Sequence, residues 1–406
     1  MDWYKSKRII SNDLTFYLFV GAFFSMPIGT SPPIICSVLA SVIWVFSGKA
    51  TKTMDTCLRR SWFWPVLLLI FLPWIGLLYT PDLTGLGFKF AKKTHYWMYC
   101  MAVASISFGI HSPQKLIKAF LFGLAINSLV AILQLVGLVP AIDIYGSKQY
   151  LGFGLGYSTQ SAFLIVGMLV ASYYFKVSTK KGARIFFFLL MAGYLFHLVI
   201  LLGRVGYFTL AILSPLIVRN LFKEFNVFKI FMVYILLLGI TFLSPIVRER
   251  VSLSIDELKH HLTADPGSAW GKKYTKHQDR FYMWYGAVNI FLENPLFGVG
   301  TGGYATALKE RGKPEWPFIA HPHNNFLHMA ASYGVIGIFA LLWFFWEIIK
   351  NAWGERHTPL GYFILSTALV IFVSGLVDTH ILDSGPAFLL AVATGLQNGL
   401  EKYVRG

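Results

Sequence analysis

Long apolar runs separated by short polar breaks occupy most of the chain, and a bilayer needs about 20 such residues per helical crossing. Inside a bilayer each backbone group must bond within its own segment, which favours helices. The sequence therefore predicts an all-α integral membrane protein in which residues 1–406 form a single polytopic domain. We count about 12 transmembrane helices, near residues 14–29, 32–47, 62–79, 95–110, 116–139, 157–175, 185–202, 204–218, 230–246, 326–349, 360–377 and 386–401.

Composition and charge placement support this interpretation. The chain is 56% hydrophobic and only 13% charged, against about 25% charged residues in an ordinary soluble domain. Its net charge of +16 comes mainly from Lys and Arg in alternate loops, which the positive-inside rule assigns to the cytoplasm. This orientation makes both termini cytoplasmic and explains the basic charge without nucleic acid. Three isolated cysteines indicate free thiols: Cys36, Cys57 and Cys100.

One long segment, residues 247–325, is not membrane-like and is predicted to be an extracytoplasmic loop between transmembrane helices nine and ten. Within it, apolar residues recur at helical spacing over residues 279–293, which predicts an amphipathic helix at the membrane interface. Asn294 and Pro295 would end that helix, and the run GVGTGG would form a flexible turn. A phosphate-binding loop would need a preceding strand and a following Lys-Ser/Thr, and this run has neither.

His321 and His323 stand at the end of this loop, directly before the next apolar run. A histidine titrates near neutral pH and can accept the proton of a sugar hydroxyl, so general base catalysis is one interpretation. The other is a solvated start of a helix capped by Asn324 or Asn325. A metal site is less favoured because the pair lacks nearby carboxylates and no clustered acids occur in the outer loops. Asp378 and Asp383 flank the last outer turn; they could line the cavity of the site, but a solvated turn is favoured.

Five cations are candidates for binding an anionic substrate at the outer surface. Arg204 interrupts two apolar runs, where a charge is costly unless it faces a cavity, a partner or a substrate; snorkelling to headgroups is the alternative. Arg280 borders the predicted amphipathic helix, where a solvated arginine is the alternative. Lys89, Lys92 and Lys93 place a basic edge in a short outer loop, where the positive-inside rule predicts none. Together they would suit a lipid pyrophosphate.

Three blocks, in this order, carry a resemblance to a known family: LLGRVGYF, DRFYMWYGAVNIFLENPLFGVGTGGY and HPHNNFLHMAASYGVIGIF. They span about residues 200–340. The chain resembles the bacterial superfamily of O-antigen ligases and O-antigen polymerases, which are integral membrane glycosyltransferases with a C-type-like fold. The arginine block reads Gly-Arg-Val-Gly where the family more usually has Ser/Thr-Arg-Gly or Ser/Thr-Arg-Ala.

The resemblance implies that His323 is the catalytic base and that Arg204 and Arg280 bind the pyrophosphate. His321, Asn324 and the three lysines would contact substrate. The implied reaction transfers a glycan from undecaprenyl pyrophosphate to an acceptor hydroxyl, with inversion and without metal or cofactor, on the periplasmic side of the bacterial inner membrane. The acceptor is lipid A-core for a ligase, which we favour, and another lipid-linked repeat for a polymerase. A lipid-linked sugar transporter is a third alternative, although we find no internal repeat.

Overall fold

The computed structural model describes residues 2–48, 50–106, 111–141, 151–201, 203–222, 280–311 and 318–399, with isolated positions between 228 and 255. These ranges are helical and contain no β-strand. The main helices are α1 (Asp2–Ser25), α2 (Ser31–Phe46), α3 (Ala50–Leu58), α4 (Phe63–Ile75), α5 (Phe88–Lys92), α6 (His95–Ala104), α7 (Gln114–Leu135), α8 (Tyr157–Val177), α9 (Lys181–Ile200), α10 (Arg204–Leu221), α13 (Arg280–Glu293), α14 (Gly303–Arg311), α15 (Asn325–Gly354), α16 (Pro359–Ser374) and α17 (Ser384–Leu396).

Helices occur at the predicted apolar runs wherever the chain is described, although some, such as α4 and α16, are shorter than predicted and others, such as α10 and α15, are longer. Four helices in the described ranges are long and apolar enough to cross a membrane alone, namely α7, α8, α9 and α15, and the bent pair α2 and α3 would add a fifth. Apolar helices of 10–17 residues include Asp13–Ser25 within α1, Phe63–Leu78, which joins α4 to the short 3₁₀ turn after it, and the whole of α16. The chain is thus a helical membrane protein, and the number of twelve crossings stays a prediction.

The predicted loop at residues 247–325 is described mainly over residues 280–311 and 318–325. The helix predicted over residues 279–293 is present as α13, whose buried side chains Met283, Ala287 and Ile290 pack in one cluster with Tyr304 of α14. Its place at the membrane interface stays a prediction. The Tyr304 hydroxyl donates a hydrogen bond of 2.9 Å to the carbonyl of Met283. The first part of the predicted loop lies almost wholly outside the described residues.

Helix α15 is broken at Gly334, whose φ of 62° is in the left-handed region. The break leaves backbone groups that must find partners elsewhere, because each unpaired buried group costs free energy. The Gly-rich segment supplies these partners. Val299 N donates a hydrogen bond of 2.9 Å to the carbonyl of Ala331, and Gly300 N donates one of 2.9 Å to the carbonyl of Ser332. The predicted flexible turn is therefore packed against a broken helix.

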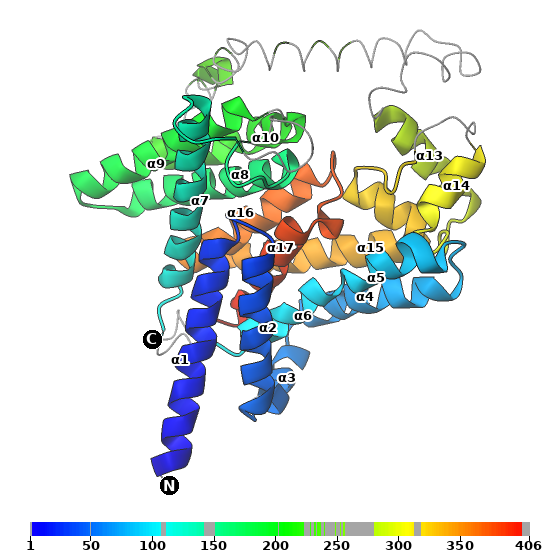
Figure 1. Ribbon diagram of the computed structural model, residues 1–406, viewed down its shortest axis with the longest axis horizontal. Helices are drawn as coiled ribbons and strands as arrows, with labels where there is room; N and C mark the ends of the chain where they lie inside the picture. The colour runs from blue at the N-terminus through cyan, green and yellow to red at the C-terminus, as the bar shows by residue number, and fades with distance from the viewer. Residues whose placement is uncertain are drawn as a thin grey trace.

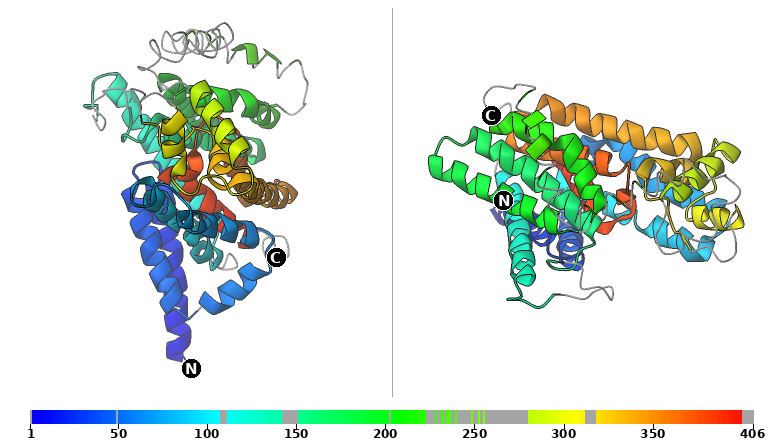
Figure 2. Two further views of the ribbon diagram at one scale, coloured as in Figure 1. Left: turned by 90° about the vertical axis from the view of Figure 1, so that its right-hand side faces the viewer. Right: turned by 90° about the horizontal axis from the view of Figure 1, so that it is seen from above.

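Helices α16 and α17 occupy the centre of the molecule (Figure 1). Helices α8, α9 and α10 lie on one side and α13 and α14 on the other, with α16 and α17 between them (Figure 1). The view from above keeps this separation (Figure 2). Helix α8 is buried continuously from Gln160 to Tyr174. Its first turn lies beside the turn that follows α16, since Ser158 donates a hydrogen bond to Asp378.

Candidate active site

His323 lies on the last turn before α15, held by the cap of that helix. The Asn324 side-chain oxygen accepts hydrogen bonds from Phe326 N at 2.9 Å and Leu327 N at 3.0 Å, so Asn324 is the N-cap. His323 itself has a φ of 49°, and it is the one residue other than glycine in the described ranges with a positive φ. Such backbone strain costs about 1–3 kcal/mol and is found mainly at functional sites.

The imidazole of His323 is bonded to a carboxylate 55 residues further along the chain. Its Nδ1 lies 2.9 Å from Oδ1 of Asp378, in the turn that follows α16. Asp378 is only 6% exposed, so the prediction of a solvated turn is wrong for this residue. The prediction failed because the loop before α15 packs on the turn after α16 and excludes solvent from it. The sequence of neither segment indicates this contact.

The Asp378 carboxylate is ionised. Burial alone would raise its pKa, but the hydrogen bond from His323, the charges of His380 and His323, and a hydrogen bond from Ser158 together lower that pKa well below its usual range. An ionised carboxylate can only accept, so Nδ1 of His323 carries the proton of this bond. When Nε2 carries no proton, its lone pair is available on the ring side away from Asp378, as a general base requires.

Further hydrogen bonds lock the two loops together. Asn324 N donates to Thr379 Oγ1 at 2.9 Å, and Asn324 Nδ2 donates to the carbonyl of Leu376 at 2.7 Å. Asn325 N donates to the carbonyl of Gly375 at 2.7 Å. These bonds give the Asn324 side chain a structural role, and its predicted contact with substrate stays a prediction.

Four helices begin around the His323–Asp378 pair. Asn325 opens α15, and Ser158, the second residue of α8, donates to Asp378. The start of α17 meets the same turn of α8, since a Cβ on Gly385 would lie 2.8 Å from Thr159. The start of α10 does so as well, since a Cβ on Gly203 would lie 3.0 Å from the Tyr157 ring. Helix N-termini carry partial positive charge, so their convergence favours an anionic ligand.

Arg204 is the first residue of α10 and is half-buried. Its neighbour Gly203 packs on Tyr157, and a Cβ on Gly206 would lie 2.7 Å from Ser161 Oγ, so both glycines are needed for close packing on α8. The structure thus places the start of Arg204's helix against the turn of α8 that binds Asp378. Arg280 opens α13 and is also half-buried. Its approach to His323 stays a prediction.

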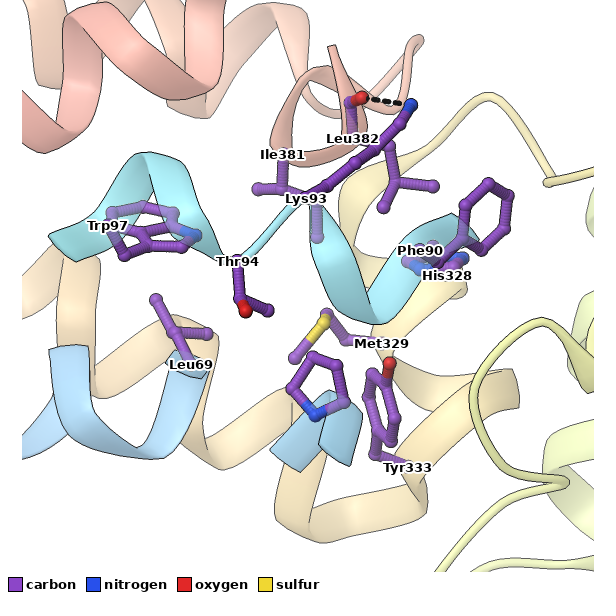
Figure 3. Close-up of a pocket in the computed structure, with 11 residues that line it drawn as sticks. Leu69, Phe90, Lys93, Thr94, Trp97, His328, Met329, Tyr333, Ile381 and Leu382 are labelled. Atoms are coloured by element: carbon purple, nitrogen blue, oxygen red, sulfur yellow. Dashed lines mark hydrogen bonds between the residues drawn. The ribbon is translucent and has the colours of Figure 1, made fainter. Parts of the chain in front are cut away.

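The three predicted lysines divide between two environments. Lys89 and Lys92 are exposed on α5, whereas Lys93 reaches inward and donates to the carbonyl of Leu382 (Figure 3). Burial lowers the pKa of Lys93, an effect opposed by the charge of Asp383 and reinforced by Lys89. Lys93 also borders a cavity of about 30 Å³ with His328 and Tyr333, which is room for about one water molecule. Of the three, Lys93 is the one tied to the turn that contains Asp378.

His321 lies beside His323, with 4.5 Å between the two ring centroids. Burial, followed by the charges of His323 and His328, lowers the pKa of His321 to about 3. His321 is consequently neutral at physiological pH. It can therefore pack beside the His323 ring without adding a charge.

Asp378, His380 and Asp383 are the described residues that could hold a metal ion, with ligand atoms within 4.8 Å of one another. The prediction of no clustered acids in the outer loops is therefore wrong, because the short 3₁₀ turn His380–Leu382 folds the two carboxylates together. Asp378 already accepts from His323, Thr379 N and Ser158. Asp383 lies 3.4 Å from His380, and its charge acts on Lys93. Protein donors and cations thus already compensate both carboxylates.

The middle of the chain is similar to a family of known proteins. Residues 150–342 match the family described as O-Antigen ligase. The chain is also similar to a Rickettsia conorii protein named "Putative polysaccharide ligase", with 21% identity over 146 residues, 34% of this chain and 33% of that protein. The chain thus matches about a third of the length of that relative. The resemblance predicted from the sequence is confirmed, and the matched region holds Arg204, Arg280 and His323 but ends before Asp378.

Proposed function

We propose that this protein is an O-antigen ligase that transfers a glycan from undecaprenyl pyrophosphate to a hydroxyl of lipid A-core on the periplasmic side of the bacterial inner membrane. The family match over residues 150–342 supports the class of enzyme. The observation that carries the mechanism is the bond of 2.9 Å between His323 and buried Asp378, at a point where helix N-termini converge.

The proposed reaction begins with the acceptor. Nε2 of His323 takes the proton of the acceptor hydroxyl while the oxygen attacks the anomeric carbon of the donor glycan. The new C–O bond forms opposite the bond to phosphate, which breaks with its electron pair moving to the departing undecaprenyl pyrophosphate, so the anomeric configuration inverts. Asp378 stabilises the imidazolium that results. A positioned general base typically contributes 10²–10⁴-fold to the rate.

The departing pyrophosphate gains negative charge, which the surrounding groups are placed to stabilise. We assign this role to Arg204 and Arg280, supported by Lys93 and by the N-termini of α8 and α10. Preorganised cations and dipoles are effective here because they need no reorganisation during the reaction. A guanidinium can also bind phosphate oxygens bidentately. The exposed Lys89 and Lys92 would attract the anionic headgroup to the site.

The location of the site at helix ends suits a lipid-linked donor. The polyprenyl tail would stay in the hydrocarbon while the pyrophosphate reaches the starts of α8 and α10. The donor would then approach from the bilayer and the acceptor from the periplasm. Both termini of the chain would be cytoplasmic in this orientation.

The test uses purified full-length protein in lipid nanodiscs with the lipid-linked donor and lipid A-core. Wild-type protein should form the glycan–lipid A-core conjugate, and His323→Ala should lose at least 100-fold of that rate. His357→Ala is the matched control, because His357 is exposed and only its backbone carbonyl is used in a hydrogen bond. A normal rate for His323→Ala would exclude the proposed base.

Two further arms separate the alternatives. Donor incubated without lipid A-core should give no longer glycan, whereas a polymerase would extend the lipid-linked chain under these conditions. Arg204→Lys keeps the charge and removes the planar fork, so we expect a loss of about tenfold or more if the guanidinium binds two oxygens. Full activity of the lysine variant would show that a point charge suffices.

A further inference from the structure

Ser158 makes an unusual hydrogen bond for a serine within a helix. Ser161, Ser172 and Ser374 each donate to a carbonyl three or four residues earlier in their own helix. This is the usual local partner of a helical hydroxyl. Ser158 instead donates across to Oδ2 of Asp378, 220 residues away in sequence. Its hydroxyl is thus used to join two elements at the site.

The bond from Ser158 controls how the carboxylate is turned. Oδ1 of Asp378 meets Nδ1 of His323, and Oδ2 meets Ser158, so the two carboxylate oxygens are held by different elements. The terminal torsion of an aspartate is broad and has no sharp rotamer of its own. A contact at Oδ1 alone would therefore leave the plane of the carboxylate, and with it the His323 ring, less well defined.

The same turn of α8 also fixes the position of the arginine helix. Tyr157 packs on Gly203, directly before Arg204, while Ser161 packs on Gly206 one turn further along. The rest of α8 is buried in the interior, so this turn has little freedom to move. The first turn of α8 is consequently in contact with both halves of the proposed site.

We propose that Ser158 is a positioning residue that holds Asp378, and through it Nε2 of His323, in register with the pyrophosphate site at the start of α10. The assignment rests on the proposed glycosyl transfer. This role needs no contact between Ser158 and either substrate. It acts through Asp378, and its contribution is to the geometry of proton transfer.

The experiment compares Ser158→Ala, Ser158→Thr and Ser172→Ala as full-length proteins in nanodiscs, with kcat and the KM for donor measured for each. Ser158→Ala should lower kcat about tenfold and leave KM within about twofold, because donor binding does not need the hydroxyl. Ser158→Thr restores the hydroxyl and should recover kcat to within about threefold of wild type. Ser172 lies on the same helix, fully buried and far from the site, so Ser172→Ala should retain wild-type kcat.

Several results would overturn the inference. One is a kcat for Ser158→Ala within twofold of wild type. Another is failure of Ser158→Thr to recover activity, or an equal loss in Ser172→Ala, either of which would indicate a general packing defect. If His323→Ala is inactive while Ser158→Ala is normal, the positioning role alone fails. If His323→Ala is fully active, the proposed function fails first.

Discussion

Replacing Asp378 with Asn removes the charge at the site and keeps the shape of the side chain. An asparagine oxygen can still accept from Nδ1 of His323 and from Thr379 N, which both meet Oδ1 in the structure. Ser158 can rotate its hydroxyl to accept from the new amide. The variant therefore tests whether the carboxylate acts through its charge or through its geometry.

The size of the effect follows from the distance between the two groups. Unit charges 2.9 Å apart in an effective dielectric of about 20 attract by roughly 6 kcal/mol, which is a ceiling for the stabilisation of the imidazolium. The His323 side chain is 26% exposed, so solvent screens part of this attraction. A retained contribution of roughly 3–4 kcal/mol corresponds to a loss of about 10²–10³-fold in kcat.

The assay is conjugate formation from lipid-linked donor and lipid A-core, with kcat and donor KM determined separately. Asp378→Asn should lower kcat by this factor with KM nearly unchanged, because the charge matters when the imidazolium forms. Glu310→Gln, the same chemical change on the exposed end of α14, is the control and should behave as wild type. A kcat for Asp378→Asn within threefold of wild type would refute the role of the charge.

Three further predictions address the loops that carry the site. Gly300→Ala should lower the thermal midpoint well below that of Gly137→Ala. Both glycines have φ near 80°, but only a Cβ on Gly300 would lie 2.6 Å from the carbonyl oxygen of Gly76. Equal midpoints for the two variants would contradict this prediction. Asn324→Ala should cost about 1–2 kcal/mol of stability through loss of the cap, together with reduced kcat, measured by thermal denaturation and conjugate formation. Because the pKa of His321 in the folded protein is lowered to about 3, the unfolded chain takes up the proton first, so stability present above about pH 6.5 should decline as pH falls toward 3. His321→Gln should flatten this decline in the midpoint measured between pH 6 and 4, and an unchanged slope would exclude His321 as its source.

The positions of the helices could be read from the sequence because burial in a bilayer leaves a strong local signal. The run at residues 157–175 became α8, and that at 326–349 became most of α15. The lengths of the helices were harder to predict. Pro73 falls inside α4 and Gly334 breaks α15, and each interruption is stabilised by residues distant in sequence. Thr301 illustrates this, since its hydroxyl donates to the carbonyl of Pro73.

The Gly-rich segment shows the same limit more sharply. Its composition indicates a turn, and Gly298, Gly300 and Gly302 do have positive φ. What it packs against has no local signature, because the carbonyls of α15 become available only where that helix breaks. The glycines are needed for close approach: a Cβ on Gly298 would lie 2.4 Å from the backbone of Ser332. The sequence therefore indicates the glycines of the turn but not the backbone of α15 on which they pack.

Some residues of the candidate site could be predicted from local sequence, whereas others depend on contacts with distant residues. Arg204 could be proposed from the sequence because a charge beside apolar runs is costly wherever it packs, and His323 because it stands at a helix start in a recognisable block. Asp378 was missed because an acid in a short turn is ordinarily solvated, and its burial depends on His323, 55 residues earlier, and on Ser158, 220 residues earlier. The cost of burying Asp378 is met only when both partners arrive. A buried carboxylate with a serine on one oxygen and a histidine on the other is consequently a property of the assembled helices, and it orients the base only in the folded protein.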